Sequence, residues 1–305
     1  MLKKIILLAG PTASGKSRLA IKIAKKIGGE IINADSMQVY KEFSILSARP
    51  SIKDLDKIKH HLYGFLSVKD YFSSSEWLRL AKQKIKLCIK NKKVPILVGG
   101  TGLYFNAIIK GISKIPEINL RERDKIRKLH QNIGQKKFYE KLQLIDPLVK
   151  DKINPSDVQR TIRAYEVKKL TKKSLYEWAI NTKSDFSKFD IKKVFLNVPR
   201  DVLLKNINKR ITKMFDSKCI NEVSCFLNLN IDRSLSANKM IGVNEITNYL
   251  SGISTLEQVK ERINIKTRQY AKSQNTWARG HMSNWSHLYF KDFSQLYKKI
   301  LKVVS

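Results

Sequence analysis

Eight residues near the start of the chain form a complete phosphate-binding loop, which limits the possible folds more than any other feature. They have the spacing GxxxxGK[ST] and are Gly10, Pro11, Thr12, Ala13, Ser14, Gly15, Lys16 and Ser17. The apolar run 5–9 predicts a buried strand before the loop, and 18–27 predicts a helix after it. Such a loop directs backbone N–H groups and a positive helix end at an anion. Lys16 adds a charge and Ser17 a hydroxyl that can bind Mg²⁺, so the sequence predicts a site for a di- or triphosphate. The alternative is a turn that binds no ligand.

Strands and helices alternate through the first part of the chain. Apolar segments at 30–35, 60–64 and 94–98 predict further strands. Ser73, with Glu76 three residues later, predicts a capping box that begins a helix ending near Lys90. Another helix is expected from Leu103. This alternation is typical of a parallel sheet with helices on both faces.

The alternation stops after residue 115. The segment 116–189 shows no strand pattern, and helical periodicity with dense lysine and arginine replaces it. A strand is expected again at 194–198, then a helix capped by Asp201, and a long helix over 256–279 that Gly280 ends. We therefore predict a P-loop NTPase-like α/β core, 1–115 plus 190–305, with a helical insertion domain at 116–189.

The charge of the chain indicates a polyanionic partner. Sixty lysines and arginines oppose 26 acidic residues, which gives a net charge of +34 and a pI near 10.0. Contacts between basic side chains and phosphates release counterions and favour nucleic-acid binding, although a lysine-rich composition explains part of the excess. Three basic segments mix charge with polar or aromatic groups: 159–163, 239–242 and 267–279. Along the last segment and the turn before it, Ile263, Tyr270 and Trp277 lie seven residues apart and form an apolar or stacking stripe; an amphipathic surface helix is the alternative.

Cysteine and histidine positions argue against a zinc site. Cys88, Cys219 and Cys225 are scattered, without C-x-x-C spacing, which fits a reducing compartment. Adjacent His60 and His61 on a strand point to opposite faces, so we expect one in the core and one hydrogen-bonded. No segment is long enough to span a membrane or to form a signal peptide. We expect a cytoplasmic protein.

Two further strand ends carry reactive groups that should meet the phosphate loop in one cleft. Asp35 ends one strand and can bind Mg²⁺ or act as a general base; a helix cap is its alternative role. Thr101, in the glycine-rich segment 99–102, can donate a hydrogen bond to the oxygen of a leaving group; the alternative is that it only stabilises the turn. The sequence after the loop contains no apolar run that ends in Asp-Glu, which would supply the usual metal-binding acid of an ATPase. It also contains no arginine-rich lid of the kind that small kinases close over their nucleotides. We therefore expect the loop to bind a diphosphate that acts as a leaving group.

Together these residues resemble the tRNA dimethylallyltransferases (tRNA isopentenyltransferases) of the bacterial type. The resemblance covers nearly the whole chain. The segments that carry it, in order, are 10–17, 33–40 (NADSMQVY), 99–104 (GGTGLY), Asp157 with 159–167, and 267–277.

The resemblance implies transfer of a dimethylallyl group from dimethylallyl diphosphate to N6 of the adenosine 3′ to the anticodon of a tRNA. Asp35 would accept the N6 proton, Lys16 and Mg²⁺ on Ser17 would stabilise the diphosphate, and Thr101 would assist at the bridging oxygen. The adenine would be flipped into the cleft, and the insertion would clasp the anticodon stem-loop. The residues implied to contact tRNA are Asp35, Ser36, Met37, Gln38, Thr101, Arg123, Gln159, Arg160, Thr161, Ile162 and Arg163. A monomer suffices for this activity.

Four positions depart from the family pattern. Ser44 and Leu46 replace an acid and a glycine, Lys218 stands where glycine is common, and Val243 stands where tyrosine is usual. The last two are expected to affect RNA contacts, and reduced activity is one consequence. Two other functions remain open: a nucleoside or nucleotide kinase, which shares the loop and sheet, and a tRNA-binding homologue with a weak catalytic site.

Overall fold

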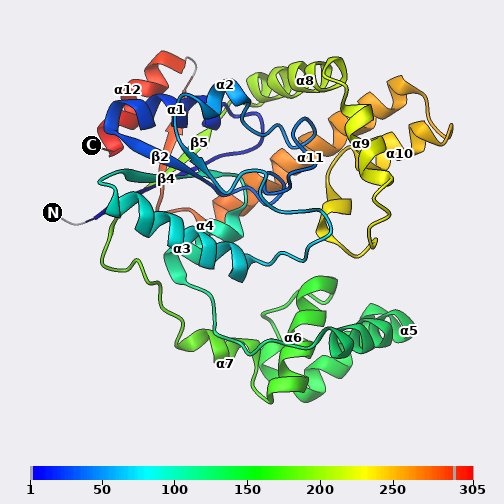
Figure 1. Ribbon diagram of the computed structural model, residues 1–305. Helices are drawn as coiled ribbons and strands as arrows, with labels where there is room; N and C mark the ends of the chain where they lie inside the picture. The colour runs from blue at the N-terminus through cyan, green and yellow to red at the C-terminus, as the bar shows by residue number, and fades with distance from the viewer. Residues whose placement is uncertain (1–2, 291–292, 305) are drawn as a thin grey trace. The chain divides into compact units, whose positions relative to one another are not determined.

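A six-stranded parallel sheet forms the centre of the larger part of the molecule (Figure 1). The computed structural model describes residues 3–290 and 293–304. The strand order is β3-β2-β4-β1-β5-β6, and all neighbouring strands within the described residues pair in parallel. The strands are β1 (Lys4–Ala9), β2 (Gly29–Asn33), β3 (His60–His61), β4 (Val94–Gly99), β5 (Asp190–Asn197) and β6 (Ser286–Tyr289). The predicted P-loop-type parallel sheet is confirmed.

Both faces of the sheet are covered because its central strands are apolar throughout. In β1, Ile5 to Leu8 have no exposed surface. Ile6 and Leu8 pack with α1 (Lys16–Ile27) and α12 (Phe293–Val304) on one face. Alternate side chains of a strand point to the opposite face, where α3 (Ser74–Lys90) and α4 (Gly102–Lys110) lie (Figure 1).

A second apolar cluster lies beside the sheet, formed by the helices that follow β5. These are α8 (Arg200–Asp216), α9 (Cys219–Leu227), α10 (Val243–Leu250) and α11 (Leu256–His281), with η2 (Ser236–Lys239) between α9 and α10. The long segment between β2 and β3, with its short helix α2 (Ile52–Leu55), contributes Val39, Phe43 and Leu46 to this cluster. This segment therefore packs as part of the core.

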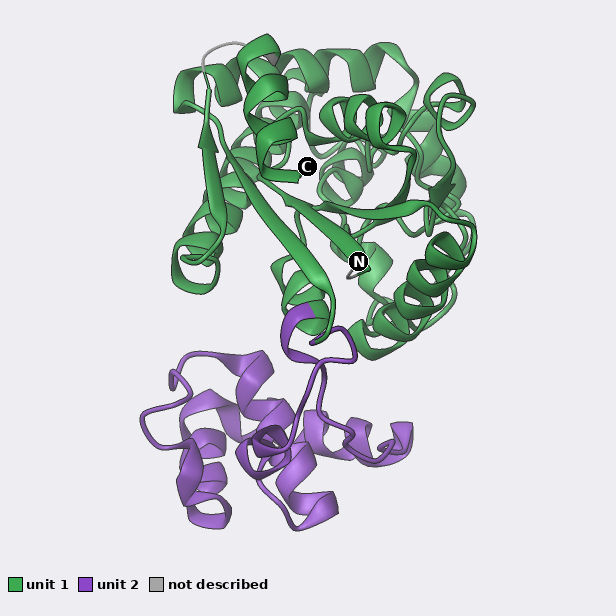
Figure 2. Ribbon diagram, turned by 90° about the vertical axis from the view of Figure 1, so that its left-hand side faces the viewer, with its two compact units in different colours: residues 1–108, 188–305 green, residues 109–187 purple. Residues whose placement is uncertain are grey.

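The chain divides into two compact units, coloured separately in Figure 2. The first comprises 1–108 and 188–305, and the second 109–187. The second unit contains α5 (Leu120–Ile145, kinked at Gly134, φ 75°), η1 (Pro147–Val149), α6 (Val158–Thr171) and α7 (Leu175–Ile180). Its own core includes Phe138, Leu142 and Ala164. The segment predicted as a helical insertion at 116–189 falls in this unit except for its last two residues.

Three predicted helix ends can be compared with the structure. Ser73 caps α3 and accepts a hydrogen bond from the Glu76 N–H, as predicted. Asp201 is not the cap of α8: Pro199 precedes that helix, and Asp201 lies in its first turn, where a negative charge favours the helix dipole. Gly280 does not end α11, which continues to His281 with Met282 at its C-cap.

Candidate active site

The phosphate-binding loop connects β1 to α1, as the sequence predicted. Gly15 has φ 80° and Ala13 φ 61°, so the chain curls tightly before the helix. The Ser14 N–H donates to the Pro11 carbonyl at 3.2 Å, and the Ser14 hydroxyl is buried without a partner among the described residues. A buried hydroxyl without a partner carries a desolvation cost that a bound anion would relieve. This loop fits a phosphate group.

Lys16 folds back over the loop, where its ammonium group donates to the Pro11 carbonyl at 3.0 Å. Burial lowers the pKa of Lys16 to about 8; the Asp35 carboxylate opposes this shift and the nearby Arg210 adds to it. Lys16 and Arg210 thus place two cations beside the phosphate-binding loop. A bound diphosphate would neutralise them and raise the pKa of Lys16 again.

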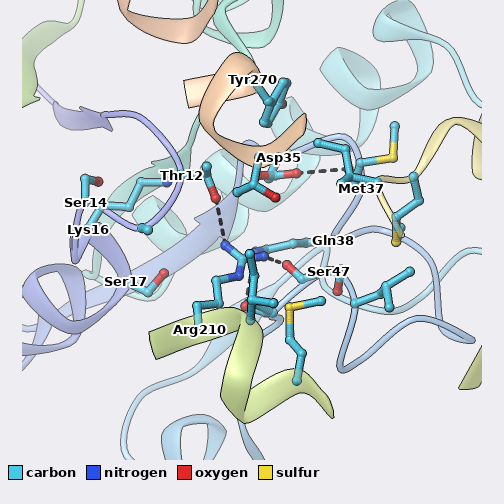
Figure 3. Close-up of a pocket in the computed structure, with 18 of the residues that line it drawn as sticks. Thr12, Ser14, Lys16, Ser17, Asp35, Met37, Gln38, Ser47, Arg210 and Tyr270 are labelled. Atoms are coloured by element: carbon cyan, nitrogen blue, oxygen red, sulfur yellow. Dashed lines mark hydrogen bonds between the residues drawn. The ribbon is translucent and has the colours of Figure 1, made fainter. Parts of the chain in front are cut away.

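Asp35 lies directly after β2, and local hydrogen bonds fix its backbone. The Asn33 side chain accepts from the Asp35 N–H at 2.8 Å and donates to the Asp35 carbonyl at 2.9 Å. One Asp35 carboxylate oxygen accepts from the Met37 N–H at 3.0 Å (Figure 3). The next helix begins only at Ile52, so Asp35 is not a helix cap. Its other carboxylate oxygen is left for chemistry in the cavity.

Thr101 joins the ends of two strands. Its hydroxyl accepts a hydrogen bond from the Ser36 N–H at 3.0 Å, and its own N–H donates to the Ala34 carbonyl at 3.2 Å. Gly99 permits this approach, because a Cβ there would lie 1.9 Å from the Ala34 carbonyl oxygen. Asp35, Ser36 and Thr101 are therefore held together, as their positions at strand ends predicted.

A cavity of about 350 Å³ brings the loop and Asp35 together. Its polar side includes Lys16, Ser17 and Asp35, and Gln38 also lines it, with its amide donating to the Ser47 carbonyl at 3.0 Å (Figure 3). The lining also includes a group of apolar side chains, here called the apolar wall: Met37, Leu46, Ile211, Met214, Met240, Ile241 and Ile263. The cavity thus offers both an anion site and hydrocarbon contacts.

The sequence analysis missed Arg210, Asn206 and Gln274. From α8, the Arg210 guanidinium donates to the Thr12 hydroxyl at 2.7 Å and the Asn206 amide donates to the Ala13 carbonyl at 3.1 Å. Burial lowers the pKa of Arg210, and Asp35 opposes the shift. From α11, the Gln274 oxygen accepts from the Thr12 N–H at 2.7 Å while its amide donates to the Gly100 carbonyl at 3.0 Å.

The predicted stripe on α11 faces these groups. Ile263 and Tyr270 line the first cavity, while Tyr270 and Trp277 line a second of about 280 Å³ that also includes Thr101. The basic residues of the same helix, Arg268, Lys272 and Arg279, are exposed. Of the basic segment 239–242, Lys239, Met240 and Ile241 line the first cavity, and Met240 is also buried in the core.

Within the second unit, the residues expected to contact RNA differ in exposure. Gln159 and Arg160 are exposed at the start of α6. Arg123 and Arg163 are partly exposed, and both pair with the buried Glu166, at 3.4 and 3.2 Å. Thr161 is fully buried: its hydroxyl donates to the Asp157 carbonyl at 2.7 Å and accepts from Gln135. Ile162 packs against the core of this unit. The side chains of Thr161 and Ile162 therefore support α6, and an RNA surface here would consist of the glutamine and the arginines.

Comparison with known proteins identifies the family. A family model described as IPP transferase matches residues 38–281. The tRNA dimethylallyltransferase of Pelagibacter ubique is 54% identical over 282 residues, covering 92% of this chain and 90% of that protein. The Rickettsia felis protein of the same name is 41% identical and covers 99% and 98%. This chain belongs to the IPP transferase family.

Solved structures of similar proteins share the fold of this IPP transferase family member. The tRNA isopentenylpyrophosphate transferase of Bacillus halodurans is 30% identical, with a TM-score of 0.71, and covers 98% of this chain and 95% of its own. A eukaryotic dimethylallyltransferase acting on tRNA, 25% identical, gives a TM-score of 0.84 over 98% of this chain and 77% of that one. Both similarities span the two units.

The structure shows the surroundings of the four positions that depart from the family pattern. Ser44 donates through its N–H and hydroxyl to Glu222, which also accepts from the N–H groups of Ile45 and Leu46. Lys218 has φ 64°, a conformation that favours glycine. Val243 is 2% exposed in the core, which places it away from any RNA surface and contradicts the expectation for that residue.

Glu30, His61 and Cys88 meet in the core of this family member, although they are 27 to 58 positions apart in the sequence. His61 Nε2 lies 2.6 Å from the Glu30 carboxylate, and the Cys88 thiol donates to the same carboxylate at 3.5 Å. These hydrogen bonds connect the three buried side chains to one another. His60 points elsewhere, with Nδ1 2.7 Å from the Ile58 carbonyl, so the expected division between the two histidines is confirmed.

None of the helices within the described ranges combines the length and apolarity that crossing a membrane requires.

Proposed function

We propose that this protein transfers the dimethylallyl group of dimethylallyl diphosphate to N6 of the adenosine 3′ to the anticodon in tRNA. The observation that carries the proposal is the first cavity, where a phosphate loop, one carboxylate and an apolar wall face the same space. The phosphate loop suits the diphosphate and the apolar wall suits a branched hydrocarbon. The names of the related proteins, tRNA dimethylallyltransferases, support the same activity.

Charge changes during the reaction explain the residues present. As the bond from C1 of the donor to the bridging oxygen breaks, negative charge moves to the diphosphate. Lys16, Arg210 and the loop N–H groups would stabilise that charge, and Thr101 would donate to the bridging oxygen. N6 of adenine is a weak nucleophile, so Asp35 would accept its proton as the new bond forms. Charge interactions inside a partly enclosed cavity are less screened by solvent than in water, so each of these contacts gains strength there.

Mg²⁺ fits the residues at the phosphate loop. Ser17 and Asp35 line the same cavity, and Mg²⁺ commonly binds one or two protein oxygens together with substrate phosphates. When bound there, the ion would neutralise part of the diphosphate charge. Ser17 would provide its hydroxyl as the ligand.

The RNA would reach the site with the target adenine unstacked, because its N6 group is inaccessible within a stacked loop. We assign contacts with the RNA near the reacting base to 35–38 and Thr101, and contacts with the anticodon stem-loop to Arg123, Gln159, Arg160 and Arg163 of the second unit. We further infer that one chain acts alone, in the cytoplasm. Light scattering at micromolar concentration, with one chain expected, tests the first point.

One assay tests the proposed function. Labelled dimethylallyl diphosphate, Mg²⁺ and an anticodon stem-loop carrying the adenosine should yield labelled N6-alkyladenosine, and the same stem-loop with guanosine at that position should not react. Asp35→Ala should abolish transfer while donor and RNA binding persist. Phosphoryl transfer from ATP to a small acceptor without RNA would instead establish a kinase. Tight RNA binding without turnover would establish a binding protein.

A further inference from the structure

Tyr270 lines both of the cavities described above, which belong to the first unit. The first cavity holds the phosphate loop and Asp35, and the second holds Thr101 and Trp277. Only Ser36 and Tyr270 line both. In Figure 3 the ring of Tyr270 projects from α11 beside Asp35. The side chain therefore stands where the two spaces adjoin.

The spacing along α11 explains this position. Ile263, Tyr270 and Trp277 are seven residues apart, so they follow one another along a single face of the helix. Ile263 lines the first cavity and not the second, and Trp277 lines the second and not the first. Tyr270 lies between these two residues on the same face of α11 and lines both cavities. An aromatic ring suits such a boundary because it is large, flat and has few rotamers.

The phenol of Tyr270 is neutral in this environment. Burial and the neighbouring Asp35 carboxylate raise its pKa, while Arg210 opposes the shift. Burial and Asp35 also raise the pKa values of Tyr63 and Tyr104, so the carboxylate acts on three phenols. A neutral phenol is a much weaker nucleophile than a phenolate, so the Tyr270 hydroxyl does not compete for the allylic group.

We infer that the ring of Tyr270 excludes water from the allylic carbon and thereby makes an RNA nitrogen, and not water, the acceptor. This inference rests on the proposed function. In transfer, N6 forms a bond to C1 of the dimethylallyl group, the C1–O bond breaks, diphosphate leaves with the electron pair and Asp35 takes the N6 proton. In hydrolysis, a water oxygen forms that bond, Asp35 takes a water proton, and the products are dimethylallyl alcohol and diphosphate. The two reactions share every other step, so access of water decides between them.

The test measures how the labelled dimethylallyl group is divided between alcohol and RNA, at saturating stem-loop and Mg²⁺. Tyr270→Phe keeps the ring and should behave as the unmodified protein. Tyr270→Ala should raise the alcohol share at least tenfold, while the rate of total diphosphate release stays within about threefold. Tyr249→Ala, on α10 and outside both cavities, is the control and should leave the division unchanged.

Tyr270→Leu guards against a folding defect, because leucine fills much of the ring volume without its flat shape. It should fold normally by circular dichroism and also raise the alcohol share. An unchanged division in both variants, or parallel loss of alcohol and transfer in both, overturns the inference. Failure of the unmodified protein to alkylate RNA would overturn the proposed function itself, and that result is separate from any effect at Tyr270.

Discussion

The Arg210 guanidinium donates a 2.7 Å hydrogen bond to the Thr12 hydroxyl and so ties α8 to the phosphate-binding loop. This bond links residues that are 198 positions apart, and it places a second cation beside Lys16. The loop therefore depends on a helix that follows β5 as well as on its own sequence.

Replacing Arg210 should impair use of the donor. Arg210→Gln removes a charge aimed at the departing diphosphate, and we expect kcat/KM for dimethylallyl diphosphate to fall by about 10²-fold. Arg200→Gln, at the exposed start of the same helix, is the matched control. Steady-state kinetics with varied donor check both. If the two variants have the same kcat/KM for the donor, Arg210 does not contribute to diphosphate binding.

Donor affinity should depend on pH through Lys16. Its pKa is about 8 in the free protein, and a bound diphosphate raises it, so the complex holds the proton to higher pH. Affinity should be constant from pH 7 to about 8 and decline above it, because the free protein then loses the charge. Titration calorimetry between pH 7 and 9.5 measures this. Lys16→Arg, which does not titrate there, should bind with a flat profile; an identical decline would implicate another group.

The same pKa has a consequence for stability. A lysine whose pKa falls from 10.5 to about 8 on folding binds more protons in the unfolded chain, so stability rises as the pH increases from 8 to 10.5. Below pH 8 Lys16 is charged in both the folded and the unfolded chain, so the folded state carries the full free-energy cost of burying that charge. Lys16→Met should therefore raise the free energy of unfolding at pH 7 by about 1 to 3 kcal/mol, while it abolishes transfer. Urea unfolding at pH 7 and pH 10.5 measures the difference, which should shrink at the higher pH.

Two glycines offer a matched pair of alanine substitutions. A Cβ at Gly99 would lie 1.9 Å from the Ala34 carbonyl oxygen, so Gly99→Ala should destabilise the protein by about 2 kcal/mol or more and displace Thr101. At Gly280, near the end of α11, a Cβ meets nothing within 4 Å, and Gly280→Ala should stabilise by about 0.5 to 1 kcal/mol. Thermal unfolding ranks the two variants. Similar melting temperatures would contradict the close contact of β2 and β4.

Glu166 should affect RNA use without affecting the chemical step. It is 1% exposed and holds Arg123 and Arg163, so Glu166→Gln frees both guanidiniums to move. We expect KM for the stem-loop to rise about tenfold with kcat within about twofold, and Glu166→Asp to recover part of the loss. Glu140→Gln, exposed in the same unit, is the control. A fall in kcat alone would show that Glu166 acts otherwise.

Short-range patterns in the sequence predicted much of this site. The spacing of 10–17 and the apolar run before it were sufficient for the loop, and the position of Asp35 and Thr101 at strand ends was sufficient to bring them together. The seven-residue spacing on α11 also predicted a stripe of Ile263, Tyr270 and Trp277, although the sequence associated this stripe with a nucleic-acid surface and the structure places it in the linings of the two cavities. These features depend on residues near in sequence and on the general geometry of parallel sheets.

Contacts between distant segments were not predictable in the same way. Arg210 belongs to no recognisable sequence motif. It contacts the Thr12 hydroxyl only because α8 packs against the phosphate-binding loop. Thr161 belongs to a polar, basic segment, yet helix geometry turns it inward to Asp157 and Gln135. Val243 was misjudged for the same reason, since its burial depends on the cluster around α10.

The carboxamide of Gln274 binds two loops at once: its oxygen accepts from the Thr12 N–H, and its nitrogen donates to the Gly100 carbonyl. A glutamate at this position would set an anion against a carbonyl oxygen, and a lysine would direct a cation at an N–H group. The chain thus contains a buried position that requires a neutral side chain with both a donor and an acceptor, long enough to reach the two loops at once.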